Sequence, residues 1–172
     1  GFGITQDITG HKSTELLLEE SQKRYAGIVE SAMDAIITID AGQHILVFNA
    51  AAEKMFGCKA DEAIGASIEQ FIPERFRTAH NGHIRAVRDT GTTIRKKGEK
   101  GAVRGLRANG EEFSIEASIS QCEINREKAF TVILRDVTER ERVDSLLKEQ
   151  LKLQDQLTKV TASAPGLICS FR

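Results

Sequence analysis

The sequence lacks several features that would place it at once in a known class of protein. None of its 172 residues is tryptophan and only two are proline, which excludes a proline-rich linker and a collagen-like repeat. No apolar run approaches the roughly 18 residues that a membrane-spanning helix requires. Lysine and arginine number 24 against 25 aspartate and glutamate, so the formal net charge of −1 gives no electrostatic reason to expect binding to nucleic acid or to an anionic membrane.

Cysteine is also scarce. Cys58, Cys122 and Cys169 are odd in number, stand far apart and form no Cys-x-x-Cys pair, which argues against a zinc cluster and a disulfide framework. No secretory signal opens the chain, because its first ten residues are polar and lack a basic segment. The chain has no initiator methionine, so we expect a segment of a longer protein. Its thiol content favours a reducing, cytoplasmic compartment.

The sequence contains no recognisable catalytic motif. It has no Gly-x-Ser-x-Gly, Walker A, His-Glu-x-x-His or dinucleotide-binding glycine pattern. Gly98, Gly101 and Gly105 are too loosely spaced to cradle a phosphate. We therefore predict that this segment is not an enzyme. The basic run at 95–100 is interpreted as a solvated loop, with binding to an acidic partner as the alternative.

The pattern of apolar residues predicts an α+β fold with an antiparallel sheet. Helices are expected over 13–29, 50–57, 61–65, 73–91 and 137–159, and strands over 35–40, 44–49, 101–106, 113–124 and 129–134. Residues 1–10 look β-like, and 91–101 is expected to be a mobile loop. Because helices and strands do not alternate one by one, parallel βαβ units are not expected.

The strand predicted over 113–124 leads to a definite prediction of which side chains are buried and which are exposed. Its alternating apolar side chains should face the core: Phe113, Ile115, Ala117 and Ile119. The intervening Ser114, Glu116 and Ser118 should be exposed. A strand alternates between two faces, so this choice of register applies to all of these residues together.

Two short segments of the chain resemble other segments about 130 residues away. Residues 4–9 are similar to 133–138, and 28–32 are similar to 160–164. Chance can produce matches this short. The common spacing favours a tandem array of domains, of which this chain holds one whole copy.

Five segments in order resemble the PAS family of sensor domains. They are SAMDAIITID at 31–40, ILVFNAAAEKMFGCKADEAIG at 45–65, FIPERFRTAHNGHIRAVRDTG at 71–91, GLRANGEEFSIEASIS at 105–120 and FTVILRDVTERER at 130–142. The resemblance implies a five-stranded antiparallel sheet in the order 2-1-5-4-3, with helices on one face and a signalling helix at each end. It also implies a sensory, signal-transducing module of a bacterial protein.

Together with the repeat, this resemblance divides the chain into five parts. They are the tail of a preceding PAS domain at 1–12, a linker helix at 13–30, the PAS domain at 31–138, a coiled-coil linker helix at 139–160 and the start of a following PAS domain at 161–172. The output domain would lie outside this chain. We expect it to be a histidine kinase of a two-component system or a cyclic-dinucleotide enzyme such as a diguanylate cyclase.

The helix predicted over 73–91 carries the candidate ligand-binding residues. On a helical wheel His80 falls within the apolar stripe of Phe76, Ile84 and Val87, and His83 falls near it. A histidine in such a stripe needs a hydrogen-bond partner or a metal. A hydrogen-bonded core histidine is one interpretation, and a ligand to a cofactor is the other.

The resemblance extends to haem-binding PAS domains, whose proximal histidine lies on this helix. Their pattern Arg-x-x-His-x-x-hydroxyaromatic-Ile is similar to residues 77–84 here, where His83 replaces the aromatic residue. It implies b-type haem, with His80 as axial ligand to the iron and His83 as the fallback. The binding pocket would be formed by Phe76, Ile84, Val87, Ile115 and Ile119.

Some haem-binding relatives place a distal arginine or methionine after this helix. Here Lys97, Lys100 and Arg104 lie nearby, but none matches that position. The departure suggests a five-coordinate iron that is open to a diatomic gas. Flavin fits less well, because Cys58 lacks the Asn-Cys-Arg-Phe pattern of the light-sensing subgroup. A PAS domain without cofactor, which dimerises and relays a signal, is the alternative function.

The end of the chain carries two further predictions. Asp136 and Thr138 correspond to the closing motif of the family, and side chains of this type cap a helix start and join it to the sheet. The helix that follows has a narrow apolar seam at heptad spacing: Val143, Leu146, Leu153, Leu157 and Val160. Such a seam predicts a homodimer through a two-stranded coiled coil, with packing on its own domain as the alternative. Neighbouring PAS and output domains of the same polypeptide are the other expected partners.

Overall fold

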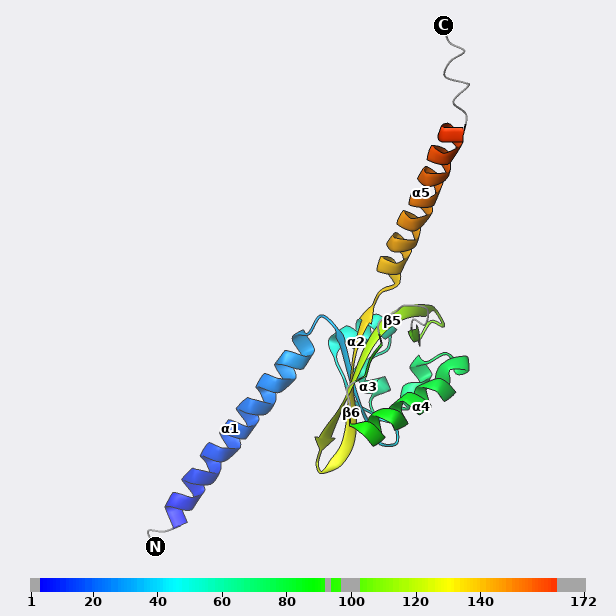
Figure 1. The fold of residues 1–172 in the computed structure, drawn as a ribbon. Coiled ribbons are helices and arrows are strands. Elements are labelled where there is room, and N and C mark those ends of the chain that lie inside the picture. Colours follow the sequence, from blue (N-terminus) through cyan, green and yellow to red (C-terminus); the bar gives the residue numbers. More distant parts are fainter. Residues whose placement is uncertain (1–3, 92–93, 97–102, 164–172) are drawn as a thin grey trace.

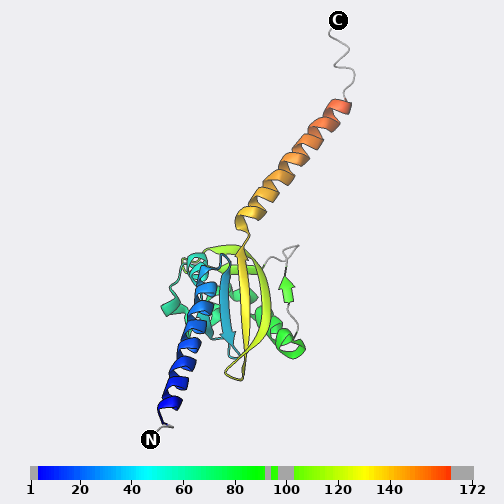
Figure 2. The ribbon, with the colours of Figure 1, turned by 90° about the vertical axis from the view of Figure 1, so that its left-hand side faces the viewer.

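The computed structural model describes residues 4–91, 94–96 and 103–163. One antiparallel sheet carries helices on one face, and the first and last helices of the chain are long and extend away from this body (Figures 1 and 2). The helices are α1 (Ile4–Ser31), α2 (Ala50–Phe56), α3 (Ala60–Ala63), the 3-10 turn η1 (Ile68–Phe71), α4 (Glu74–Thr90) and α5 (Thr138–Ser163). The strands are β1 (Ala35–Asp40), β2 (Ile45–Phe48), β3 (Ile94–Lys96), β4 (Val103–Leu106), β5 (Glu112–Ile124) and β6 (Glu127–Asp136).

The strand order of the sheet is β2-β1-β6-β5-β3, and β4 also pairs with β5. Residues 94–96 pair with 119–117 of β5, and residues 103–106 pair with 115–112. β3 and β4 therefore follow the same edge of β5 in succession and act as one interrupted strand. Counted in this way, the sheet has the five-stranded order 2-1-5-4-3, which confirms the prediction.

Local sequence signals explain where the helices on the sheet begin and end. Asn49 caps α2 by accepting a hydrogen bond from the Ala52 amide on its side-chain oxygen at 3.0 Å. Gly57 and Gly91 follow α2 and α4 in the left-handed conformation, with φ of 69° and 64°. Pro73 immediately precedes α4. The predicted hairpin and these helices are confirmed to within a few residues.

The core lies between the sheet and the short helices. Four phenylalanine rings meet there, from β2, α2, η1 and β5: Phe48, Phe56, Phe71 and Phe113. The ring centroids of Phe56 and Phe71 are 4.6 Å apart, and those of Phe56 and Phe113 are 5.5 Å apart. Burial of each such side chain contributes about 1.5–3 kcal/mol. This cluster fixes α2 and η1 against one end of the sheet.

Two predicted elements differ in the structure. Residues 4–10 begin helix α1 and do not form a strand. A strand without a neighbour leaves its backbone groups unpaired, whereas a helix pairs them within the segment. In the predicted loop at 91–101, residues 94–96 form β3, because the free edge of β5 provides a partner. Residues 1–3, 92–93, 97–102 and 164–172 lie outside the described residues, so most of the predicted start of a following domain is not covered.

The burial prediction for β5 is confirmed on the inner face and wrong on the other face, where none of the three residues predicted to be exposed is exposed. Phe113, Ile115 and Ala117 are buried and Ile119 is partly buried. Ser114, predicted to be exposed, has only 1% of its surface accessible. The start of α5 covers it, since the Val137 amide donates to its carbonyl oxygen at 3.0 Å. Further along the strand, the two remaining outward residues, 116 and 118, are half-buried.

The terminal helices extend away from the body (Figure 1). α1 leaves beside the uncovered face of the sheet, and α5 continues beyond the end of β6 (Figure 2). Within the described ranges, no helix has the combination of length and apolar character needed to cross a membrane.

Candidate functional site

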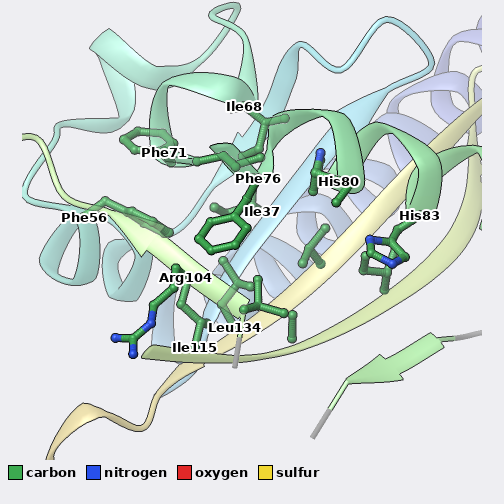
Figure 3. A pocket seen from close by; sticks show the side chains of 16 residues that line it. Ile37, Phe56, Ile68, Phe71, Phe76, His80, His83, Arg104, Ile115 and Leu134 are labelled. Atoms are coloured by element: carbon green, nitrogen blue, oxygen red, sulfur yellow. The ribbon is translucent and has the colours of Figure 1, made fainter. Parts of the chain in front are cut away.

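A cavity of about 240 Å³ lies between α4 and the inner face of the sheet (Figure 3). Its walls come from α2, η1, α4 and four strands, and almost all the lining side chains are apolar. The polar exceptions are His80, His83 and Arg104. Apolar walls with a few polar groups are typical of small-molecule sites, in which the polar groups orient the ligand.

The cavity brings together most of the residues predicted to bind a cofactor. Phe76, His80 and His83 line it from α4, and Ile115 and Ile119 line it from β5. The two other predicted residues, Ile84 and Val87, are buried in the core and are absent from the lining. Further lining residues that the sequence did not single out come from the short helices and the central strands: Phe56, Ile68, Phe71, Ile37, Val132 and Leu134.

His80 has an unsatisfied nitrogen at this site. Its Nδ1 atom is buried and has no hydrogen-bond partner among the described residues. Burial lowers the pKa of the imidazole, and the neighbouring His83 lowers it further. The Glu69 carboxylate and a hydrogen bond with Asn81 act in the opposite direction but are outweighed. The ring is therefore neutral at neutral pH, and a neutral imidazole has one nitrogen lone pair with which it can bind a metal.

A polar cluster fixes the helix beside His80. The Gln43 side-chain amide donates to Asn81 Oδ1 at 2.7 Å, and Asn81 Nδ2 donates to Glu69 Oε1 at 3.2 Å. These bonds connect the β1–β2 turn and η1 to α4. Gln43 has a φ of 67°, so its backbone adopts a conformation that is uncommon for residues other than glycine. No local sequence signal identifies this cluster, because its members come from three separate elements.

The donor chemistry of the cavity fits haem better than an isolated metal ion. No group of three or more metal-ligating side chains occurs within the part of the chain that the structure describes. Haem iron needs only one axial ligand from the protein, and a neutral histidine is the commonest choice in gas-binding haem proteins. His80 supplies that ligand type next to apolar walls. The Arg104 guanidinium points away from both histidines, toward the other end of the lining (Figure 3).

The predicted joint at the start of α5 is a connected set of hydrogen bonds. Asp136 Oδ1 accepts from the Thr138 amide at 2.9 Å, and Thr138 Oγ1 accepts from the Ser114 amide at 3.1 Å. Burial raises the pKa of the Asp136 carboxyl, but hydrogen bonds from Thr138 and Arg107 outweigh this effect and hold the pKa below its ordinary value. The carboxylate therefore stays ionised and caps the helix.

Arg107 is a central residue of this joint that sequence analysis missed. Its Nη2 atom donates to Asp136 Oδ2 at 2.6 Å, and its Nη1 atom donates to the Met55 carbonyl oxygen. The guanidinium carbon also lies 3.9 Å from the centroid of the Phe113 ring. One side chain thus connects the end of α2, the core and the start of α5.

A second missed ion pair lies on the other side of β6. Arg135 Nε donates to Asp34 Oδ1 at 3.0 Å, and Arg135 Nη2 donates to Asp34 Oδ2 at 2.7 Å. Asp34 lies in the short connection between α1 and β1. Residues 34 and 135 are 101 positions apart in the chain, so no local pattern identifies the pair.

The predicted apolar seam of α5 lies on the exposed surface of the helix. All five predicted seam side chains are exposed: Val143, Leu146, Leu153, Leu157 and Val160. α1 also exposes large apolar side chains, among them Leu17, Tyr25 and Ile28. These surfaces are available for association, and a coiled-coil dimer through them stays a prediction.

Comparison with known proteins identifies the type of domain. Residues 33–139 match the family described as PAS domain. The chain is 33% identical over 169 residues to sensor protein FixL of Bradyrhizobium diazoefficiens, covering 98% of this chain and 33% of that protein. It is 27% identical over 124 residues to oxygen sensor protein DosP of Escherichia coli K12, covering 72% and 15%. The chain thus spans a third or less of these relatives.

Solved structures show the same architecture. The PAS domain of an HTR-like protein from Haloarcula marismortui aligns with a TM-score of 0.62 and 23% identity, over 73% of this chain and 98% of that one. A PAS domain from Colwellia psychrerythraea aligns with a TM-score of 0.59 and 23% identity, over 69% and 98%. At such identity the likeness establishes the fold alone.

Proposed function

Because this chain belongs to the PAS domain family, we propose that it is a sensory module whose cavity beneath α4 binds b-type haem through His80. The observation that carries this proposal is the buried His80 Nδ1 atom, which has no partner among the described residues and belongs to a ring at the wall of an apolar cavity. Leaving a buried polar atom unpaired is costly, so this position favours a bound group that supplies a partner. The similarity to a protein named as an oxygen sensor supports the same interpretation.

Several lining residues have a distinct part in this proposal. His80 would hold the iron, and His83, one turn further along α4, would be the fallback ligand. The apolar side chains of β5 that line the cavity, including Ile115 and Ile119, would exclude water from the bound group. Arg104 can pair with an acidic group of the ligand. When bound, haem supplies an iron centre that binds a diatomic gas or changes oxidation state.

The signal would leave the domain through α5. The Asp136–Thr138 joint connects strands β5 and β6 to the first turn of this helix. We propose that a change in the cavity alters this joint, and that a dimer through the α5 seam carries the change to an output domain. That domain, outside this chain, would be a histidine kinase or a cyclic-dinucleotide enzyme, with further PAS domains before and after this one.

A second candidate function is a cofactor-free relay. Its support is the size of the cavity, because about 240 Å³ is below the range of about 300–1,000 Å³ typical of sites for drug-sized ligands. In that case His80 would be a core histidine, and the domain would dimerise and relay a signal without a bound cofactor.

An absorption spectrum distinguishes the two functions. The chain is expressed with ample haem precursor, and the apoprotein is also mixed with haemin. We expect a strong Soret band that His80→Ala abolishes and that His83→Ala, the matched histidine on the same helix, retains. A colourless protein that also fails to take up haemin would overturn the haem proposal and leave the relay function.

A further inference from the structure

The two long helices attach to neighbouring strands at the same end of the sheet. α1 leads into β1 through residues 32–34, and α5 follows β6 directly after Val137. β1 and β6 pair along their length, with residue 35 opposite residue 134. The last residues before β1 and the last residues of β6 are therefore close in space although they are far apart in sequence.

A buried amide connects the end of α1 to Asp34. Asn49 Nδ2 donates to the Val29 carbonyl oxygen at 2.9 Å and to the Asp34 carbonyl oxygen at 3.2 Å. Asn49 has 1% of its surface accessible, and its Oδ1 atom accepts from the Ile36 amide at 2.9 Å. The last turn of α1 and the backbone of Asp34 are thus held by the same side chain. A displacement of α1 would therefore act on Asp34.

The Asp34 carboxylate continues this connection to β6. Both of its oxygens accept from Arg135, at 3.0 and 2.7 Å, in the two-point geometry that fixes direction as well as distance. Met33, which precedes Asp34, is 97% exposed and so packs against nothing, and Asn49 holds only the backbone of Asp34. The ion pair is therefore the main side-chain restraint on this segment from β6.

The connection then reaches α5. Arg135 is adjacent in the chain to Asp136, which accepts from the Thr138 amide in the first turn of α5 at 2.9 Å. Asp136 is also paired with Arg107 at 2.6 Å, on the other side of the strand. Two consecutive residues of β6 thus link one helix to the other.

We propose that the Asp34–Arg135 pair gives this domain a second input, in which a displacement of α1 passes directly to α5. The residues of this route are absent from the cavity lining, so the route does not depend on a cavity ligand. The partner that supplies the displacement is the polypeptide preceding this domain. The module therefore combines two signals: one from its cavity and one from the chain before it.

Distances between spin labels on the two helices test this route. Cysteines are introduced at Gln22 in α1 and Ser145 in α5, both exposed, after the native Cys58, Cys122 and Cys169 are changed to serine. Double electron–electron resonance is recorded on labelled protein diluted with unlabelled protein, so that only distances within one chain contribute. Circular dichroism verifies that each variant is folded.

We expect Arg135→Gln and the milder Asp34→Asn each to broaden the distance distribution at least 1.5-fold. The double variant should be no broader than either single variant, because both changes remove the same link. Arg75→Gln is the matched control, since it breaks the two-point Arg75–Glu112 pair, which joins α4 to β5 and contacts neither long helix. The distance distribution of Arg75→Gln should equal that of the parent protein.

Two results would overturn the proposal. One is a distribution in Arg135→Gln as narrow as that of the parent protein. The other is a double variant whose broadening equals the sum of the two single changes, because independent effects would show that the residues do not act as one link. Neither result bears on whether the cavity binds haem, so the two proposals can fail separately.

Discussion

Arg107 and Asp136 form an ion pair at 2.6 Å across 29 residues of sequence, and this pair connects the core to the outgoing helix. The arginine is held by the Met55 carbonyl oxygen and the Phe113 ring, so its position is determined by the packing of α2 and β5. Asp136 in turn caps α5. We therefore expect a change in the packing on the inner face of the sheet to alter the first turn of that helix.

The first prediction concerns this arginine. Arg107→Ala should lower the free energy of unfolding by about 2 kcal/mol, because it leaves a partly buried carboxylate and a carbonyl oxygen without their donor. Arg107→Lys should recover only part of the loss, since lysine cannot contact both groups with one planar fork. Urea unfolding monitored by circular dichroism measures both changes. Arg75→Ala, which breaks an exposed ion pair, should cost less. An equal loss in Arg75→Ala would contradict the central role of Arg107.

The second prediction concerns pH in the cofactor-free protein. Burial holds the pKa of His80 below its ordinary value of about 6.5. The unfolded chain therefore binds a proton at a higher pH than the native state does, so acidification favours unfolding. The free energy of unfolding should decrease as the pH falls below about 6.5 toward the native pKa.

Urea titrations at several pH values between neutral and mildly acidic check this dependence. His80→Leu should flatten the pH profile in this range, because the group that takes up the proton is gone. His11→Gln, which removes an exposed histidine of α1, is the control for the loss of a histidine as such. Identical profiles for the parent and His80→Leu would show that His80 contributes nothing to acid sensitivity.

The third prediction concerns the close approach of β4 to the core. A Cβ atom at Gly105 would overlap Ile115 Cδ1 and would lie 2.7 Å from Phe113 Cε1. Gly105→Ala should therefore cost about 1–3 kcal/mol of stability through overpacking. Gly82→Ala is the matched control, because a Cβ there meets nothing within 4 Å and α4 is a helix. It should stabilise the protein by about 0.5–1 kcal/mol. Thermal unfolding of both variants measures the contrast, and a stabilising Gly105→Ala would refute this account.

The fourth prediction concerns association through α5. Leu153→Asp should dissociate the dimer while the sheet stays folded, because it places a charge in the predicted seam. Leu151→Asp is the matched control, since Leu151 and Leu153 are both 56% exposed and only Leu153 belongs to the seam. Sedimentation velocity at about 100 µM, far above a micromolar dissociation constant, gives the association state. A parent protein that is monomeric at this concentration would disprove the dimer. If only Leu151→Asp dissociated the dimer, the contact surface would lie on another face of α5, one that includes Leu151.

Local chemistry explains the parts of this fold that the sequence determined. Gly57 and Gly91 end helices because they adopt positive φ, and Asn109-Gly110 marks the turn between β4 and β5. The period of apolar residues placed Phe113 and Ile115 in the core. Each of these signals acts within a few residues of chain, so it can be interpreted without knowledge of the rest.

Tertiary structure decided what depends on residues that are distant in the chain. Ser114 is buried because α5 begins over it, although its place in the strand pattern predicts exposure. Residues 94–96 form a strand because β5 has a free edge, and residues 4–10 are helical because no strand pairs with them. The size of the cavity depends on how far α4 lies from the sheet, and no periodicity encodes that distance.

The ion pairs show the same division most clearly. Sequence analysis placed Asp136 at the joint, because a carboxylate before a helix is a local signal. Neither Arg107 nor the Asp34–Arg135 pair has such a signal, because each partner is chosen by the strand register of the folded sheet. The sequence by itself thus determined most of the elements, the family and the candidate histidine. Only the folded chain decided which charges meet, because an ion pair depends on distance in space and not on distance along the chain.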